Sequence, residues 1–365
     1  MNGMSSTAAT LLREDLRDFA GYKSARSGVA LSGDAWLNAN ESPSVSPADA
    51  AGALRRYPDP QPQALRNALA SLYGVDAAQL LATRGSDEGI DLLLRAFCAP
   101  GQGAIVIAPP VFGMYAVCAR LHGARVVEVP ARDGEGGWCS DLDAMADAAL
   151  REGANLVFVC NPGNPTGEAV AEGEIEGLAR RLRGKALVVV DAAYAEFADT
   201  DAAATLLADN DNLVILRTLS KAHALAGARI GSVLASPELI SMLQRCQAPY
   251  PLAQPAVAAA LAALAPEALA QARAAAMQAR AERERLRAGL LGAAGVRRVY
   301  PSQGNFLLAR FIDAQAAFDA LLDAGVVVRD MRATAGLGDA LRISIGTPAQ
   351  NDRVLAVLAD ARQAA

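Results

Sequence analysis

The sequence is poor in the residues on which several common kinds of site depend. It has two histidines in 365 residues, His122 and His223, a poor supply for a zinc site or a Ser-His-Asp triad. Its five cysteines are scattered and form no CxxC pair, which favours reduced core cysteines in a cytosolic protein. We therefore expect no metal and a cytoplasmic location.

Long runs of one charge or of apolar residues are also missing. The net charge is -5, acids and bases are interspersed, and no basic block suggests a nucleic acid or an anionic membrane as partner. The opening stretch, MNGMSSTAATLLREDLRDF, lacks the basic-then-apolar order of a signal peptide. No apolar run is free enough of charge and proline to predict a membrane span.

What the chain does contain is a series of short apolar runs that alternate with helical patterns. QLLATRG, GAIVIAPP, ARVVEVP, NLVFVC, ALVVV, NLVIL and GSVLAS are typical of buried strands. Strands of this kind, alternating with helices, favour a mainly parallel sheet covered on both faces. Alanine-rich helices follow at 255–291, and then the order strand-strand-helix-strand-strand-helix.

This pattern predicts an α/β protein in three parts. Residues 1–35 would be an N-terminal arm with a short helix near 11–21. Residues 36–255 would form a large α/β domain, with loop at 38–62. Residues 256–365 would hold a connecting helix and a small α+β domain.

Polar residues follow four of the predicted strands. NPGNPTG (161–167) follows NLVFVC, Asp191 ends the next strand with Tyr194 three residues later, and RTLSK (217–221) ends NLVIL. Ser86-Asp87-Glu88 opens the helix after LLATRG. Because ligands of open α/β sheets bind at the carboxyl ends of strands, we expect these segments to meet in one site.

Their chemistry is that of a pyridoxal 5′-phosphate (PLP) site. The glycine-led helix start offers free N–H groups to a phosphate. Asp191, at the end of a buried strand, needs a partner such as a protonated pyridine nitrogen, and Tyr194 and Asn161 can bond a phenolic oxygen. Lys221, in apolar surroundings near Arg229, would be a nucleophilic amine suited to Schiff-base formation with an aldehyde.

The same motifs carry a family resemblance that extends over nearly the whole chain. NPGNPTG, DAAY and TLSKAHALAGARIG, in that order, resemble the PLP-dependent aminotransferases of fold type I. WLNANESP, RYPDPQPQALRNALA, TRGSDEGIDLLLRAF, PPVFGMY, NFLLARF, VVVRDM and LRISIGT are similar to the histidinol-phosphate aminotransferase family. The resemblance implies a mainly parallel, seven-stranded sheet in the large domain, beside a smaller α+β domain.

It also implies a role for each matching residue. Lys221 would hold the cofactor and move the substrate proton, with Asp191 at the pyridine nitrogen and Tyr194 at the phenolic oxygen. Tyr57 would reach the phosphate of the partner subunit's cofactor, so a homodimer is expected. The other implied cofactor contacts are Ser86, Asp87, Glu88, Phe112, Asn161, Thr218, Ser220 and Arg229. His223 replaces an aromatic residue common in the family, and we expect it to be packed and neutral.

The substrates follow from the resemblance as well. Arg342 in LRISIGT matches the arginine that binds the substrate anion, because its planar fork suits both carboxylate and phosphate. Arg329, Tyr22 and Asn161 are further substrate contacts, whereas Arg26 fits an ordinary ion pair better. The implied reaction moves the amino group between L-histidinol phosphate and 2-oxoglutarate, giving imidazole acetol phosphate and L-glutamate, a step of histidine biosynthesis.

Other functions remain open at this stage. An aromatic or broad-specificity aminotransferase would use the same cofactor machinery, and an enzyme like phosphothreonine decarboxylase would share much of it. A non-enzymatic PLP-binding regulator is disfavoured, because the N-terminal arm is too short for a helix-turn-helix domain. A Rossmann dehydrogenase is disfavoured because no G-x-G-x-x-G follows a first strand.

Overall fold

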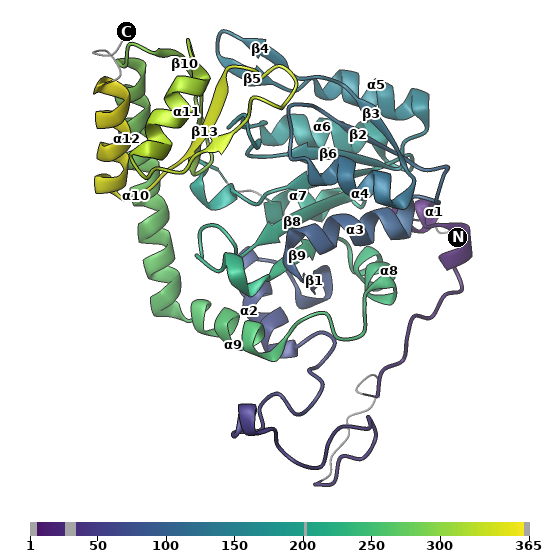
Figure 1. The fold of residues 1–365 in the computed structure, drawn as a ribbon. Coiled ribbons are helices and arrows are strands. Elements are labelled where there is room, and N and C mark those ends of the chain that lie inside the picture. The colour runs from purple at the N-terminus through teal and green to yellow at the C-terminus, as the bar shows by residue number, and fades with distance from the viewer. Residues whose placement is uncertain (1–5, 26–33, 201–202, 361–365) are drawn as a thin grey trace.

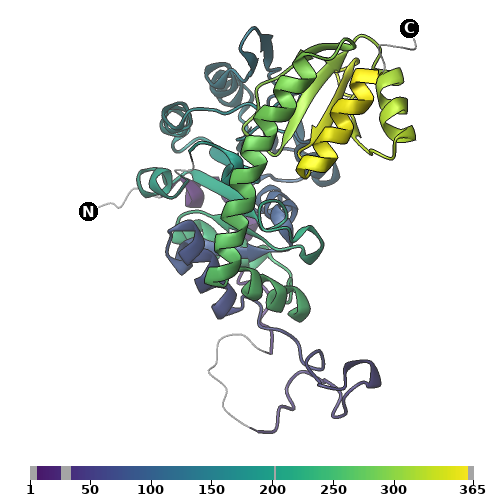
Figure 2. The same ribbon diagram turned by 90° about the vertical axis from the view of Figure 1, so that its left-hand side faces the viewer.

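The computed structural model describes residues 6–25, 34–200 and 203–360, so Arg26 lies outside the described residues. Two sheets of unequal size organise these residues, and the long helix α10 (Pro266–Leu291) runs from one to the other (Figures 1 and 2). The larger sheet lies with the N-terminal two thirds of the chain, and the smaller one lies near the C-terminus.

The larger sheet has seven strands, in the order β1-β9-β8-β7-β6-β2-β3. Strands β2, β3, β6, β7 and β8 are parallel, and β9 pairs antiparallel with both β8 and β1. The expected mainly parallel, seven-stranded sheet is therefore confirmed. The strands are β1 (Leu80–Thr83), β2 (Ala104–Ile107), β3 (Arg125–Glu128), β6 (Leu156–Cys160), β7 (Leu187–Asp191), β8 (Leu213–Thr218) and β9 (Gly231–Leu234).

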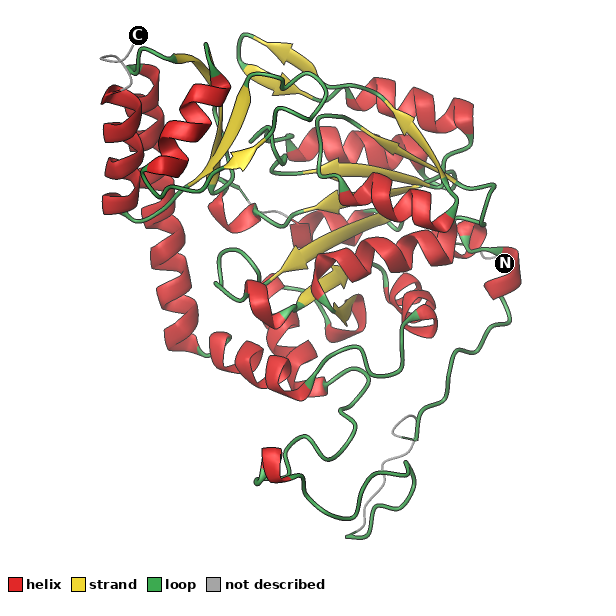
Figure 3. Cartoon of the chain, in the orientation of Figure 1, coloured by secondary structure: helices red, strands yellow, loops and turns green. Residues whose placement is uncertain are grey.

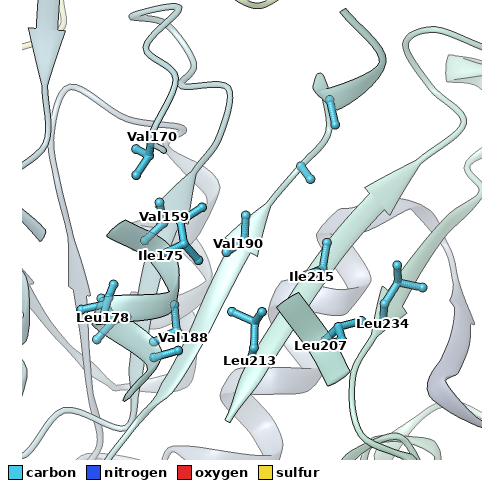
Figure 4. Close-up of a cluster of buried hydrophobic side chains, with 14 of the residues drawn as sticks. Val159, Val170, Ile175, Leu178, Val188, Val190, Leu207, Leu213, Ile215 and Leu234 are labelled. Carbon is cyan, nitrogen blue, oxygen red and sulfur yellow. The ribbon is translucent and has the colours of Figure 1, made fainter. Parts of the chain in front are cut away.

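Burial on both faces explains why the central strands have no polar alternation. Every residue of β7 is buried; Val188 and Val190 pack into one hydrophobic cluster, while Leu187 and Val189 pack into the other (Figure 4). One face is covered by α2 (Gln63–Tyr73), α5 (Leu142–Glu152), α6 (Glu172–Leu182), α7 (Ala203–Asp209) and α9 (Gln254–Ala263). The other is covered by α1 (Thr7–Leu11), α3 (Gly85–Phe97), α4 (Met114–His122) and α8 (Pro237–Cys246).

The smaller sheet is antiparallel and has the order β10-β11-β13-β12. With its helices it follows the element order expected after the connecting helix. Its elements are β10 (Val296–Val299), β11 (Phe306–Phe311), α11 (Ala314–Asp323), β12 (Arg329–Asp330), β13 (Ala340–Ser344) and α12 (Pro348–Asp360).

Three local features differ from expectation or refine it. The helix predicted near 11–21 is instead α1, which ends at Leu11, followed by a single 3-10 turn at Glu14–Leu16. A short hairpin of β4 (Arg132–Gly134) and β5 (Gly137–Cys139) was not expected, because strands this short leave little pattern. The alanine-rich stretch 255–291 forms two helices, α9 and α10.

The length and hydropathy of the helices decide whether the described residues could span a membrane. No single helix there is long and apolar enough to cross a bilayer. The pair α9 and α10 meets the length and composition criteria together, but the two helices are bent by 74° at their break.

Residues 34–62 are almost entirely loop, as expected, apart from the 3-10 turn at Pro47–Asp49. This segment extends away from the rest of the molecule (Figure 3). It exposes apolar side chains, with Leu37 89% and Leu54 56% accessible.

Candidate active site

Three neighbouring parallel strands of the large sheet have their carboxyl ends side by side. Cys160 at the end of β6 is in register with Asp191 at the end of β7, and Asp191 is in register with Leu216 of β8. The loop after β8 carries Lys221. The sheet thus brings the three sequence motifs to one edge, as strand order and direction require.

Asp191 is a buried carboxylate at this edge, with only 3% of its surface accessible. Its Oδ2 accepts a hydrogen bond from the Tyr115 hydroxyl at 2.7 Å, and its Oδ1 accepts one from the Ala193 N–H at 3.2 Å. Burial raises the pKa of Asp191 to about 6, against the lowering effect of these two donors. A cationic partner at this carboxylate would stabilise its charged form.

A second cluster of donors surrounds the start of α3. Arg229 donates to Asp87 Oδ2 at 3.1 Å and to Ser220 Oγ at 3.4 Å. Thr218 Oγ1 and Ser220 Oγ are hydrogen-bonded at 2.9 Å. The helix start, two hydroxyls and a guanidinium therefore face one place, which is the donor set that an anionic phosphate requires.

Two glycines make this arrangement possible. Gly85 has φ +73°, and a Cβ there would lie 2.4 Å from Arg229 Nη2. A Cβ on Gly231, at the start of β9, would lie 2.5 Å from the backbone N of Ser86. Larger residues at Gly85 or Gly231 would push the start of α3 away from Arg229 or from β9. Glycine at both positions therefore keeps open the space between the donors just described, which we call the anion cradle.

Lys221 lies between these clusters. Its Nζ is 5.6 Å from the centre of the Tyr194 ring. Although the residue as a whole is exposed, partial burial lowers the pKa of its amine, and the positive charges of Arg342 and Arg229 lower it further. The unusual setting of this lysine in the sequence thus has a physical result, an amine that is more readily neutral than a surface lysine.

Asn164, not Asn161, is the amide that reaches Tyr194. The Asn161 side chain is hydrogen-bonded to the Val170 backbone, donating to its O and accepting from its N, each at 3.0 Å. Asn164 Nδ2 lies 3.3 Å from the Tyr194 hydroxyl, and Arg342 Nη1 donates to Asn164 Oδ1. The structure therefore places Asn164, and not Asn161, beside Tyr194 and Arg342.

Arg342 brings the small sheet into the site. It lies on β13, its guanidinium is 5.2 Å from the centre of the Phe306 ring, and its Nε is buried without a hydrogen-bond partner in the described structure. Arg329 on β12 is in register with Arg342. Two like charges side by side repel, which makes this position favourable for an anion.

The other expected residues lie at varying distances from this centre. Phe112 packs edge-on against Tyr115, with centroids 5.6 Å apart. The Glu88 carboxylate accepts hydrogen bonds from the Arg84 N–H and from Gln247. It therefore stabilises the start of its own helix and is directed toward protein groups. Tyr57 is exposed and stacks on Tyr250 at 4.4 Å, and Tyr22 is 71% exposed.

Two residues of the site have no place among the sequence predictions. Tyr115 follows Phe112 by three residues, so both can face one side of a helical turn, but nothing in that spacing indicates a bond to Asp191. Asn164 precedes Pro-Thr-Gly in the quoted motif, which offers two asparagines. His223 has both ring nitrogens buried without a hydrogen-bond partner among the described residues, and burial lowers its pKa, so it is a packed neutral histidine as expected.

Comparison with known proteins assigns the chain to a family. The model of the family "Aminotransferase class I and II" matches residues 27–358. The chain therefore belongs to the class I and II aminotransferases.

Two similar relatives and one similar solved structure have the same name. The chain is 60% identical over 365 residues to a histidinol-phosphate aminotransferase of Stenotrophomonas maltophilia, covering all of both chains. It is 60% identical over 362 residues to that of Xanthomonas campestris pv. campestris, covering 99% of this chain and 100% of the other. The crystal structure of histidinol-phosphate aminotransferase from Sinorhizobium meliloti in complex with pyridoxal-5′-phosphate is similar with a TM-score of 0.77, at 29% identity over 90% of each chain.

Proposed function

We propose that this chain is a PLP-dependent histidinol-phosphate aminotransferase. It would move the amino group between L-histidinol phosphate and 2-oxoglutarate, giving imidazole acetol phosphate and L-glutamate. The observation that carries the proposal is the setting of Lys221, a partly buried amine whose pKa is lowered by burial and by the charge of Arg342, close to the buried Asp191. The full-length similarity to relatives of that name supports the choice of substrate.

The residues present fit PLP in three respects. The cradle of Ser86, Asp87, Thr218, Ser220 and Arg229 would hold the phosphate. Asp191 would pair with the pyridine nitrogen, which relieves the cost of its buried charge. Asn164 and Tyr194 would bond the phenolic oxygen, with Asn164 taking the place first given to Asn161. When bound, PLP supplies a cationic ring that takes up the electron pair left at the substrate Cα.

The protein's own groups would then handle protons and charge. The Lys221 amine, with its lowered pKa, would take the Cα proton and return it to the cofactor side. The Asp191 carboxylate would keep the pyridine nitrogen protonated. Arg342, already bonded to Asn164, would hold the substrate anion close to the same site, and Arg329 would add a second positive charge for a phosphate.

We further propose a homodimer and a division into arm, large domain and small domain at about residues 35 and 255. The exposed loop 34–62, with its apolar side chains and the Tyr57–Tyr250 stack, supports the dimer. A second copy that covers this loop would bring Tyr57 to the phosphate of its neighbour's cofactor. Tyr22, exposed on the arm, would enter a site by the same means.

The test is a half-reaction without keto acid. The visible absorption of the cofactor bound to the purified protein is followed while histidinol phosphate, phenylalanine, phosphothreonine or aspartate is added separately. Rapid loss of the band with histidinol phosphate alone is the expected result. Loss with phenylalanine only would assign an aromatic aminotransferase, and release of CO₂ from phosphothreonine would assign a decarboxylase. The absence of a visible absorption band from the purified protein would contradict the proposal that Lys221 binds PLP.

A further inference from the structure

Tyr115 is a fully buried tyrosine whose hydroxyl interacts with the Asp191 carboxylate and with the Cys160 thiol. It has no accessible surface and lies near the start of α4. Its ring stacks on Phe158 with centroids 4.7 Å apart, and Phe112 packs against it edge-on. The ring is therefore held on two sides, so the hydroxyl is fixed where it donates to Asp191 Oδ2.

Asp191 depends on this donor. The other hydrogen bond that the described structure gives its carboxylate is the longer one from the Ala193 N–H. Titratable groups face Asp191 from each neighbouring element: Asp87 on α3, Cys160 on β6, Tyr194 after β7, and Lys221 after β8. Asp87 disfavours the charge of Asp191, and Lys221 favours it only weakly. A neutral donor at 2.7 Å is thus a main support of the ionised carboxylate.

The hydroxyl proton stays with Tyr115. Burial and the neighbouring carboxylate raise the pKa of Tyr115 well above its ordinary range. The residue is therefore a donor throughout the pH range in which Asp191 titrates.

We propose that Tyr115 is a positioning residue that orients Asp191 and keeps it ionised, and so sets how strongly the site holds the pyridine nitrogen of the cofactor. This inference rests on the proposed function, because it concerns the carboxylate assigned to that nitrogen. It gives a task to a residue that makes no contact with the reacting atoms.

The experiment compares two cofactors on matched variants. Tyr115→Phe removes one oxygen and keeps both ring contacts. Tyr300→Phe is the control, because Tyr300 is also fully buried and its hydroxyl also donates to an aspartate, Asp133 at 2.6 Å, but it packs in the small sheet's own cluster. Dissociation constants are measured from pH 5.5 to 9 for PLP and for 1-deaza-PLP, in which a C–H group replaces the ring nitrogen.

The wild-type protein should prefer PLP, because only PLP can pair with Asp191. Tyr115→Phe should reduce that preference about tenfold and move the acid side of the PLP binding curve up by about one pH unit, as expected for a lost hydrogen bond to a charged group. Tyr300→Phe should leave both unchanged. Equal weakening of the two cofactors by Tyr115→Phe, with the preference intact, would overturn the proposal.

A second variant guards against misfolding of the first. Placing 3-fluorotyrosine at position 115 keeps the ring and hydroxyl but makes the hydroxyl a stronger donor, so the acid side of the curve should move down in pH. A shift up, or none, would overturn the proposal. A wild-type protein that does not distinguish the two cofactors would instead count against the proposed function, so the two failures are separable.

Discussion

The candidate site has two walls, one on the large sheet and one on the small sheet, and the two are held in different ways. On the large sheet, Asp191 is buried at a strand end and bonded by Tyr115 and Ala193, all within one packed unit. On the small sheet, Arg342 is held through Asn164, a residue 178 positions away on the other unit. The comparison teaches that the proposed cofactor contacts are built into one core, whereas Arg342, the proposed anion-binding residue, depends on how two units sit together.

The largest expected effect comes from the residue between the walls. Lys221→Ala should lower turnover roughly 10⁴-fold or more, because no other amine in the site can take its place. The fold and much of the PLP affinity should remain, since the phosphate cradle and Asp191 are intact. Steady-state turnover and cofactor content are measured, with Lys185→Ala, an exposed lysine before β7, as control. Comparable activity in both variants would remove Lys221 from the mechanism.

Asp191→Asn tests the buried wall and should separate activity from stability. Turnover should fall about 10²- to 10³-fold, because the pyridine nitrogen loses its counter-charge. In the cofactor-free protein, the raised folded pKa of about 6 means that the stability linked to Asp191 is present below pH 3.8 and is lost as pH rises through 6.

The asparagine side chain of the variant cannot ionise, so the variant should not lose this stability as pH rises. Cofactor-free Asp191→Asn should exceed the wild type by roughly 3 kcal/mol in unfolding free energy at pH 8, and by about half as much at pH 5. Urea unfolding at both pH values measures the difference. A gap that is the same at pH 5 and pH 8 would show that Asp191 ionisation is not its cause.

Arg342→Ala tests the other wall, and Arg329→Ala is its neighbour on the adjacent strand. Arg342→Ala should raise KM about 30-fold or more for both histidinol phosphate and 2-oxoglutarate, through the lost charge-assisted bonds. Arg329→Ala should raise KM about threefold, mainly for the phosphate substrate. KM is measured for both substrates. A large increase in the KM for 2-oxoglutarate alone in Arg342→Ala would show that the phosphate of histidinol phosphate binds elsewhere.

The smallest effect is expected from the exposed loop. Tyr57→Phe should weaken cofactor retention about threefold to tenfold in the dimer, if its hydroxyl reaches the phosphate across subunits. Tyr250→Phe is the control, because it keeps the ring stack and changes a neighbouring hydroxyl. Cofactor release and sedimentation velocity are measured together. A monomeric wild-type protein, or equal retention in both variants, would contradict the shared site.

The sequence was most informative where local pattern and strand order decide the outcome. Runs such as ALVVV and NLVIL must be buried on both faces, so the parallel sheet and the meeting of Asp191 with the Lys221 loop followed from them. It was least informative for the hairpin at 132–139, whose strands have three residues each, and for the position of the arm helix.

Only the tertiary structure decided which side chains meet. NPGNPTG contains two asparagines, and the path of the chain after β6 turns Asn161 to the Val170 backbone and Asn164 to Tyr194. Tyr115 and Asp191 are 76 residues apart and come together because α4 packs over β2 and β3, on a sheet face to which β7 also contributes. The sequence by itself determined the layers, the strand ends at which the motifs meet and the place of Lys221 among them, since those depend on hydrophobic period and chain order. The hydrogen-bond partners depend on packing between distant elements, to which no local pattern is tied.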